Sequence, residues 1–182
     1  MNKHTFYYIV LSIVLFVSCT SNSVKSTDST DLKEITGNVI KIVDGDTYDL
    51  LTVDKQTLRI RMEGIDAPEK GMPFYKVSKN HLGSLCFQKD VMIKVIETDV
   101  HDRLVADTYL DDKEMGQEMI KAGLAWHFKK YSSDETLAQL EIEARNNKVG
   151  LWTDPRPIAP WEIRRLHREG ISTKDSFSIK NN

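Results

Sequence analysis

A strict alternation of apolar and charged residues constrains the fold of this chain more than any other feature. Between Leu58 and Glu63 every second residue is apolar and every other residue is charged. Because successive side chains of a strand point to opposite faces, the pattern predicts a strand with one apolar and one charged face. The segment Gly64–Glu69 then ends the strand, with Pro68 fixing the turn.

Four more segments are rich in β-branched residues or alternate in the same way. They predict strands over 35–43, 47–53, 91–96 and 103–110. Apolar residues at helical spacing predict helices over 74–86, 114–122 and 136–147. The order is three strands, a helix, two strands and two helices. We therefore predict an α+β protein, a five-stranded OB-fold β-barrel with an inserted helix and two C-terminal helices, over residues 34–153.

The two ends of the chain differ from this body. An apolar run over 6–17 ends at Ser18–Cys19 and resembles a bacterial lipobox. It predicts a lipoprotein-type signal peptide over 1–18, a lipid on Cys19, and export to the cell envelope, or secretion if Cys19 carries no lipid. The polar stretch 19–33 predicts a flexible tether. Residues 154–182 form a Pro-containing basic extension, in which we expect a helix with a solvated basic face.

Composition excludes several classes of protein. The 182 residues fit one domain with tails, and two cysteines exclude a disulfide scaffold or a Cys-rich zinc site. With a net charge of −2 the chain cannot coat nucleic acid by bulk positive charge. Affinity for a polyanion must come from a local patch or from a bound cation.

Four carboxylates fall in two turns at the ends of predicted strands. Asp44 and Asp46 flank Gly45, which lets the backbone bend between them, and Asp66 and Glu69 share the next turn. Neighbouring carboxylates repel one another unless a cation intervenes, and oxygen ligands suit a hard cation such as Ca²⁺ or Mg²⁺. The spacing leaves open the alternative that they are solvated turn residues.

Three arginines lie on the charged faces of predicted strands: Arg59, Arg61 and Arg103. A guanidinium group binds phosphate oxygens through two donors in a fixed fork, so such arginines beside a bound cation suit a phosphodiester. Strand arginines that simply face water are the alternative. Spacing alone does not choose between Arg59 and Arg61.

Three motifs, in this order, resemble the staphylococcal nuclease (thermonuclease) family. They are Val43–Thr47, Arg59–Glu69 and Asp99–Ala106. Gly123–Trp126 and Gly150–Trp152 match later landmarks of the family, so the resemblance covers about residues 35–153.

The resemblance implies a Ca²⁺ site. Asp46 and Asp66 are similar to the two carboxylate ligands of the ion, and Ala67 to the residue that offers a backbone carbonyl. Asp44 is similar to an outer-shell acid. Two carboxylates and one carbonyl leave open positions in a Ca²⁺ shell of about 6–8 oxygens, which water and a substrate phosphate can fill.

The resemblance also implies the catalytic residues. Glu69 is similar to the carboxylate that activates the attacking water, and Arg61 and Arg103 to the two phosphate-binding arginines. The expected activity is that of a Ca²⁺-dependent nuclease acting on DNA and RNA with little sequence preference and leaving 3′-phosphate ends. We expect a monomer that contacts the membrane through the lipid on Cys19, with no protein partner.

The alternative is a non-catalytic OB-fold surface lipoprotein that binds nucleic acid or protein, and the presence of all three catalytic residues argues against it. Two positions depart from the family pattern. His101–Asp102 stands where the family has Tyr-Gly, and because Asp tolerates a positive φ we expect the turn to survive. The added charge of Asp102 could weaken the hold of Arg103 on phosphate. Phe128 stands where relatives often carry Tyr, which removes a possible hydroxyl contact.

Overall fold

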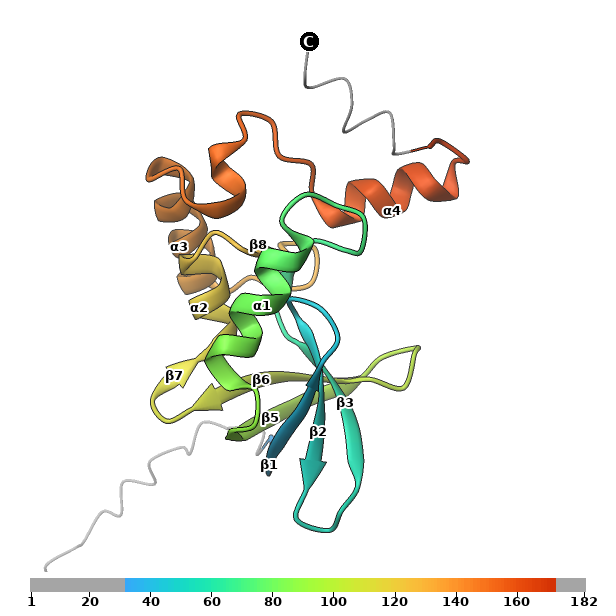
Figure 1. Ribbon diagram of the computed structural model, residues 1–182, viewed down its shortest axis with the longest axis vertical. Coiled ribbons are helices and arrows are strands. Elements are labelled where there is room, and N and C mark those ends of the chain that lie inside the picture. Colours follow the sequence, from blue (N-terminus) through green and yellow to red (C-terminus); the bar gives the residue numbers. More distant parts are fainter. Residues whose placement is uncertain (1–31, 173–182) are drawn as a thin grey trace, which may run out of the picture. The chain divides into compact units, whose positions relative to one another are not determined.

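The computed structural model describes residues 32–172 (Figure 1). The predicted signal peptide, Cys19 and almost all of the predicted tether lie outside the described residues, as does the end of the C-terminal extension from 173 onward. Within 32–172, no helix combines the length and the apolar character that crossing a membrane requires.

Five strands form a closed barrel, as the alternation predicts. They are β1 (Lys33–Ile42), β2 (Thr47–Thr52), β3 (Thr57–Met62), β5 (Asp90–Thr98) and β6 (Leu104–Leu110). Neighbouring strands pair antiparallel in the order β3-β2-β1-β5-β6, and a parallel pairing of β3 with β6 closes the barrel. The predicted α+β fold with a five-stranded OB-type barrel is confirmed.

Three short strands complete the sheets. β7 (Lys113–Glu114) pairs with the end of β6. β4 (Ile65–Asp66) and β8 (Trp126–His127) form a separate antiparallel pair, in which Asp66 lies opposite Trp126. This pair ties the turn after β3 to the C-terminal half of the chain.

The helices follow the predicted order, and in Figure 1 they gather at one end of the barrel. They are α1 (Tyr75–Cys86), α2 (Met115–Lys121), α3 (Glu135–Asn146), the short 3₁₀ helix η1 (Gly150–Thr153) and α4 (Pro160–Arg168). Glu114 caps α2 and Asp134 caps α3 by accepting backbone N–H groups of the first turn. α4 lies within the predicted extension.

The core lies inside the barrel and beneath the helices. Ile60 and Met62 of β3 are buried there, whereas Arg59 and Arg61 lie on the other face of the strand, as the alternation requires. A second, smaller cluster joins β8 to the C-terminal segment: Trp126, Ala144, Leu151, Trp152 and Ala159. Through this cluster the chain beyond η1 is held against the domain.

Candidate active site

The turn between β1 and β2 presents the first two acids. The backbone N–H groups of Val43 and Asp44 both donate to the Thr47 carbonyl, and the Asp46 N–H donates to Asp44 Oδ1 at 3.2 Å.

Gly45 has a different role in this turn from the one expected. Its φ is not positive, but a Cβ atom there would lie 1.9 Å from Ser78 Oγ of α1. Glycine is needed for close approach rather than for bending.

Asp46 links this turn to the end of β4. Its Oδ2 accepts the Ala67 N–H at 2.6 Å, and its Oδ1 accepts the Thr47 hydroxyl at 2.9 Å. Both Asp46 and Ala67 are buried. A carboxylate predicted as a metal ligand is therefore fixed by the backbone N–H of Ala67, the residue predicted to supply the carbonyl.

Arg61 joins the two turns. Its Nη1 lies 3.4 Å from Asp46 Oδ2 and its Nη2 lies 3.1 Å from Asp66 Oδ1, while Nη1 also donates to the Met62 carbonyl. The side chain is only 13% exposed. Arg59 points elsewhere and pairs with Asp49 on the neighbouring strand. The structure thus places Arg61, and not Arg59, beside the two acidic turns, a choice that spacing alone left open.

Arg103 reaches the same end of the barrel because β6 pairs with β3 in parallel, with Arg61 opposite Val105. Asp99 holds it, since Asp99 Oδ2 accepts a hydrogen bond from Arg103 Nε at 2.8 Å and Asp99 Oδ1 accepts two backbone N–H groups of the turn.

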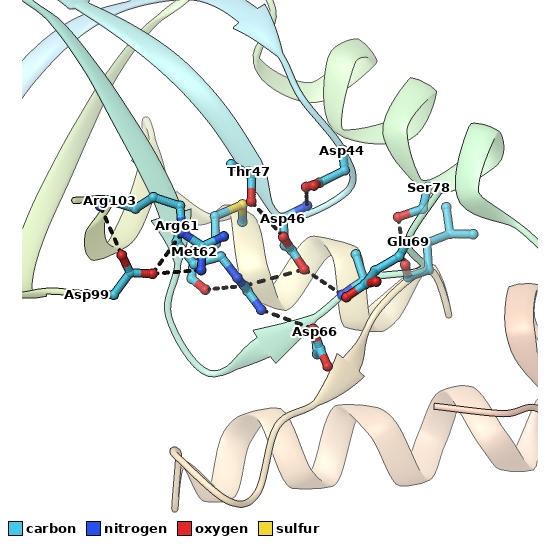
Figure 2. A network of polar contacts seen from close by, with 12 residues as sticks. Asp44, Asp46, Thr47, Arg61, Met62, Asp66, Glu69, Ser78, Asp99 and Arg103 are labelled. Carbon is cyan, nitrogen blue, oxygen red and sulfur yellow. Dashed lines mark hydrogen bonds and ion pairs between the residues drawn. The ribbon is translucent and has the colours of Figure 1, made fainter. Parts of the chain in front are cut away.

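Asp102 has a φ of 58°, so the turn survives without glycine, as predicted. The partner of Arg103 is Asp99 rather than Asp102. In Figure 2 this pair lies on one side of Arg61, and Asp44, Asp46 and Glu69 lie on the other.

Asp66 ends β4 and Glu69 lies in the turn that follows, and the two share a partner that sequence reasoning missed. Arg164 of α4 donates to Asp66 Oδ2 at 2.7 Å and to Glu69 Oε1 at 2.6 Å. Asp66 is 2% exposed, whereas the Glu69 side chain is 41% exposed and can be reached from solvent. The basic run of α4 therefore does not form only a solvated face. No local sequence pattern predicts this contact. The only related signal is the pair of apolar residues Trp161 and Ile163 beside the basic residues, which indicates a helix with one buried face.

One groove contains every predicted site residue of the domain. Its volume is about 1360 Å³, and the predicted residues that line it are Asp44, Asp46, Arg61, Asp66, Ala67, Glu69 and Arg103. Basic and aromatic side chains extend its wall: Lys129, Lys130, Tyr131, Arg165 and Arg168. Side chains from distant parts of the sequence thus face a common space large enough for a polymer backbone.

Burial and a neighbouring carboxylate disfavour the charged forms of two of these acids. Burial, followed by the charge of Asp46, raises the pKa of Asp44 to about 7. Burial raises the pKa of Asp66 to about 6, although the hydrogen bond from Arg164 opposes the shift. Burial is thus the main cause of both shifts, and the charge of the neighbouring Asp46 adds to each.

The donor set suits a hard cation. Across residues 32–172 no three or more His, Cys, Asp or Glu side chains are arranged to hold a metal. The predicted ligands are instead two buried carboxylates that lie within ion-pair distance of the same guanidinium, and the backbone carbonyl of Ala67, whose N–H donates to one of them. All of these donors are oxygen atoms in an acidic environment, the chemistry that Ca²⁺ prefers.

Comparison with known proteins agrees with this geometry. Residues 59–154 match the family described as staphylococcal nuclease homologues. A Haemophilus influenzae protein named as an uncharacterized endonuclease is 38% identical over 133 residues, which cover 73% of this chain and 75% of that protein. A Shigella flexneri protein named micrococcal nuclease is 34% identical over 147 residues, covering 75% of this chain and 84% of its own. The match to the family ends before α4.

Proposed function

Because this chain belongs to the staphylococcal nuclease family, we propose that it is a Ca²⁺-dependent phosphodiesterase that hydrolyses DNA and RNA with little sequence preference. One observation carries the proposal. Two arginines, two buried aspartates and an accessible glutamate line a single groove at one end of the barrel. These are the groups that phosphodiester hydrolysis needs: an anchor for the phosphate, a site for a cation and a base for water.

Asp46, Asp66 and the carbonyl of Ala67 would hold the cation, with Asp44 behind them. Their burial and their shared guanidinium keep the carboxylates close together despite their charge. A bound Ca²⁺ would polarise the phosphate and balance its negative charge. Local charge of this kind explains how a chain with a net charge of −2 can hold a polyanion.

Glu69 is the proposed general base. Its side chain is 41% exposed, against 7% for Asp46 and 2% for Asp66, and it lines the groove. It takes a proton from water as the water oxygen forms a bond to phosphorus. The bond from phosphorus to the 5′ oxygen breaks, and this oxygen takes a proton from solvent water as it leaves. The products carry 3′-phosphate and 5′-hydroxyl ends, as the family resemblance implies.

Arg61 and Arg103 are the proposed phosphate anchors. Arg61 lies on β3, and Arg103 directly precedes β6, the strand that pairs with β3 in parallel. Each is oriented by carboxylates, Asp46 and Asp66 for the first and Asp99 for the second. Preset donors of this kind stabilise the charge that builds on the phosphate oxygens as water attacks. Recognition through the backbone phosphate fits an enzyme that does not read base sequence.

We also propose that the enzyme acts outside the cytoplasm as a monomer, tethered through a lipid on Cys19. The support is the apolar run over 6–17 followed by Ser18–Cys19. Labelling with a radioactive fatty acid, compared between the natural chain and Cys19→Ala, tests this part. Loss of label in the variant is expected, and equal labelling would contradict it.

The activity is tested by incubating the full-length chain with plasmid DNA and with RNA, in Ca²⁺ or in excess chelator. We expect both substrates to be degraded in Ca²⁺ and neither in chelator, with 3′-phosphate ends on the fragments. Degradation that chelator leaves unchanged, or no degradation in Ca²⁺, would contradict the proposal.

A further inference from the structure

A third guanidinium enters the site from outside the part of the chain that matches the family. Arg164 lies on α4, beyond the matched residues 59–154. It contacts both acids of the second turn, with Nη2 2.7 Å from Asp66 Oδ2 and Nη1 2.6 Å from Glu69 Oε1. Its side chain is 34% exposed, so the pair is partly shielded from water.

Packing of α4 sets the position of this arginine. Trp161 stacks on Phe128, with ring centroids 5.2 Å apart and planes within 4°. Trp161 also meets Trp126 edge to face, and Ile163 is buried. Trp126 is the residue paired with Asp66 in the β4–β8 sheet. The helix therefore packs on Trp126, the residue that lies directly opposite Asp66 in this strand pair.

Charge balance gives this contact a consequence. Four carboxyl groups line this part of the groove: Asp44, Asp46, Asp66 and Glu69. Arg61 lies within ion-pair distance of Asp46 and Asp66, and Arg164 within ion-pair distance of Asp66 and Glu69. Removing Arg164 would leave the acids less compensated and would strengthen their attraction for a cation. Arg164 also occupies Oδ2 of Asp66, an oxygen of a proposed metal ligand.

We propose that Arg164 is a built-in counter-ion of the cation site, which positions Asp66 and Glu69 in the cation-free protein and competes with the divalent cation for Asp66. The inference rests on the proposed function, because it assumes that a cation binds at Asp46 and Asp66. Arg164 thus acts through the two acids and sets how much Ca²⁺ the enzyme requires. A packing role alone would have the opposite effect, since disturbing the site would weaken cation binding.

Calorimetric titration of the full-length chain with Ca²⁺ tests the proposal. We expect Arg164→Gln to bind Ca²⁺ about tenfold more tightly, the scale on which one neighbouring charge acts on an ionic equilibrium. Arg164→Lys keeps the positive charge but loses the two-donor guanidinium group. Its Ca²⁺ affinity should therefore lie between those of the natural chain and Arg164→Gln. The half-saturating Ca²⁺ concentration for DNA cleavage should fall in the same order.

Arg165→Gln is the matched control. Arg165 is the next residue of the same helix, lines the same groove and pairs with Glu169. Its removal deletes the same charge without freeing Asp66 or Glu69, so we expect Ca²⁺ affinity within about twofold of the natural chain. Circular dichroism establishes whether each variant is folded. If Arg164→Gln does not fold, the Ca²⁺ affinity of Arg164→Lys tests the proposal in its place.

The outcomes separate this inference from the proposed function. Equal or weaker Ca²⁺ binding by Arg164→Gln, in a chain whose natural form binds Ca²⁺ and cleaves DNA, overturns the inference alone. An equal gain in Arg165→Gln also overturns it, because the effect would then come from the general field of α4. If neither the natural chain nor the variants bind Ca²⁺, the proposed function falls and this inference falls with it.

Discussion

Nη2 of Arg61 lies 3.1 Å from Oδ1 of Asp66, where the chain passes from β3 into β4. This contact joins the two halves of the proposed site, since Arg61 is a proposed phosphate anchor and Asp66 a proposed cation ligand. Arg61 also lies within ion-pair distance of Asp46. The two carboxylates therefore orient the arginine before substrate arrives, and the arginine holds the carboxylates together.

Replacing Arg61 by Gln should lower the rate of DNA cleavage by about 10²–10³-fold, the usual cost of losing one donor to a developing oxyanion. Initial rates on plasmid DNA in saturating Ca²⁺ measure the effect. Arg59→Gln is the control, because Arg59 pairs with Asp49 on the same sheet and does not line the groove. We expect Arg59→Gln to cleave at a rate close to that of the natural chain. Comparable losses in both variants would contradict the assignment.

Glu69→Gln should still bind nucleic acid but cleave it about 10²–10⁴-fold more slowly, because an amide cannot take the proton from water. Binding is measured by fluorescence anisotropy of a labelled oligonucleotide, and cleavage by gel assay. Glu97→Gln is the matched control, since Glu97 is an exposed acid on β5 that lines the same groove. Unchanged cleavage by Glu69→Gln would move the general base to another residue.

Gly45→Ala should destabilise the fold by about 1–3 kcal/mol, the usual cost of overpacking. The new Cβ would lie 1.9 Å from Ser78 Oγ and 2.9 Å from Ala67 Cβ. Urea unfolding measures the change. Gly83→Ala is the control, since its Cβ would meet only Ile42 at 3.7 Å, and alanine in a helix should be neutral or stabilising by about 0.5–1 kcal/mol. In a Ser78→Ala background the cost of Gly45→Ala should shrink, and an unchanged cost would refute the clash.

Glu114 should make stability depend on pH. Burial raises the pKa of this N-cap carboxyl from 4.5 to about 7, against two backbone N–H groups that lower it. An acid with a raised pKa binds more protons in the folded than in the unfolded state, so its contribution to stability falls as pH rises from about 4.5 to about 7. Glu114→Gln removes this contribution.

Urea unfolding at pH 5 and pH 8 tests this prediction. Relative to Glu114→Gln, the natural chain should lose stability between the two pH values. Glu118→Gln, on the same helix and paired with Lys121, should leave the pH profile of the natural chain in place. Parallel profiles for Glu114→Gln and the natural chain would show that Glu114 does not titrate in this range.

Local patterns predict the barrel because its strands carry their own signal. The alternation from Leu58 to Glu63 places Ile60 and Met62 in the core and Arg59 and Arg61 outside, whatever surrounds them. The predicted strands and helices appear in the predicted order. Choosing Arg61 over Arg59 required the family resemblance, because both point away from the core and only tertiary pairing distinguishes them.

Contacts between distant segments could not be predicted in the same way. Arg164 lies 98 positions from Asp66, and a basic residue on a short helix looks the same in sequence whether it meets water or an acid. The stacking of Trp161 on Phe128 has the same character. The role of Gly45 depends on the approach of α1, which no turn motif encodes.

The parallel pairing of β3 with β6 is the last closure of the barrel in chain order, and it alone brings Arg61 beside the strand that begins after Arg103. A chain in which β6 has not yet docked has one of the proposed phosphate anchors in place without the other. Closure of the barrel is consequently the step that assembles the proposed pair of phosphate anchors.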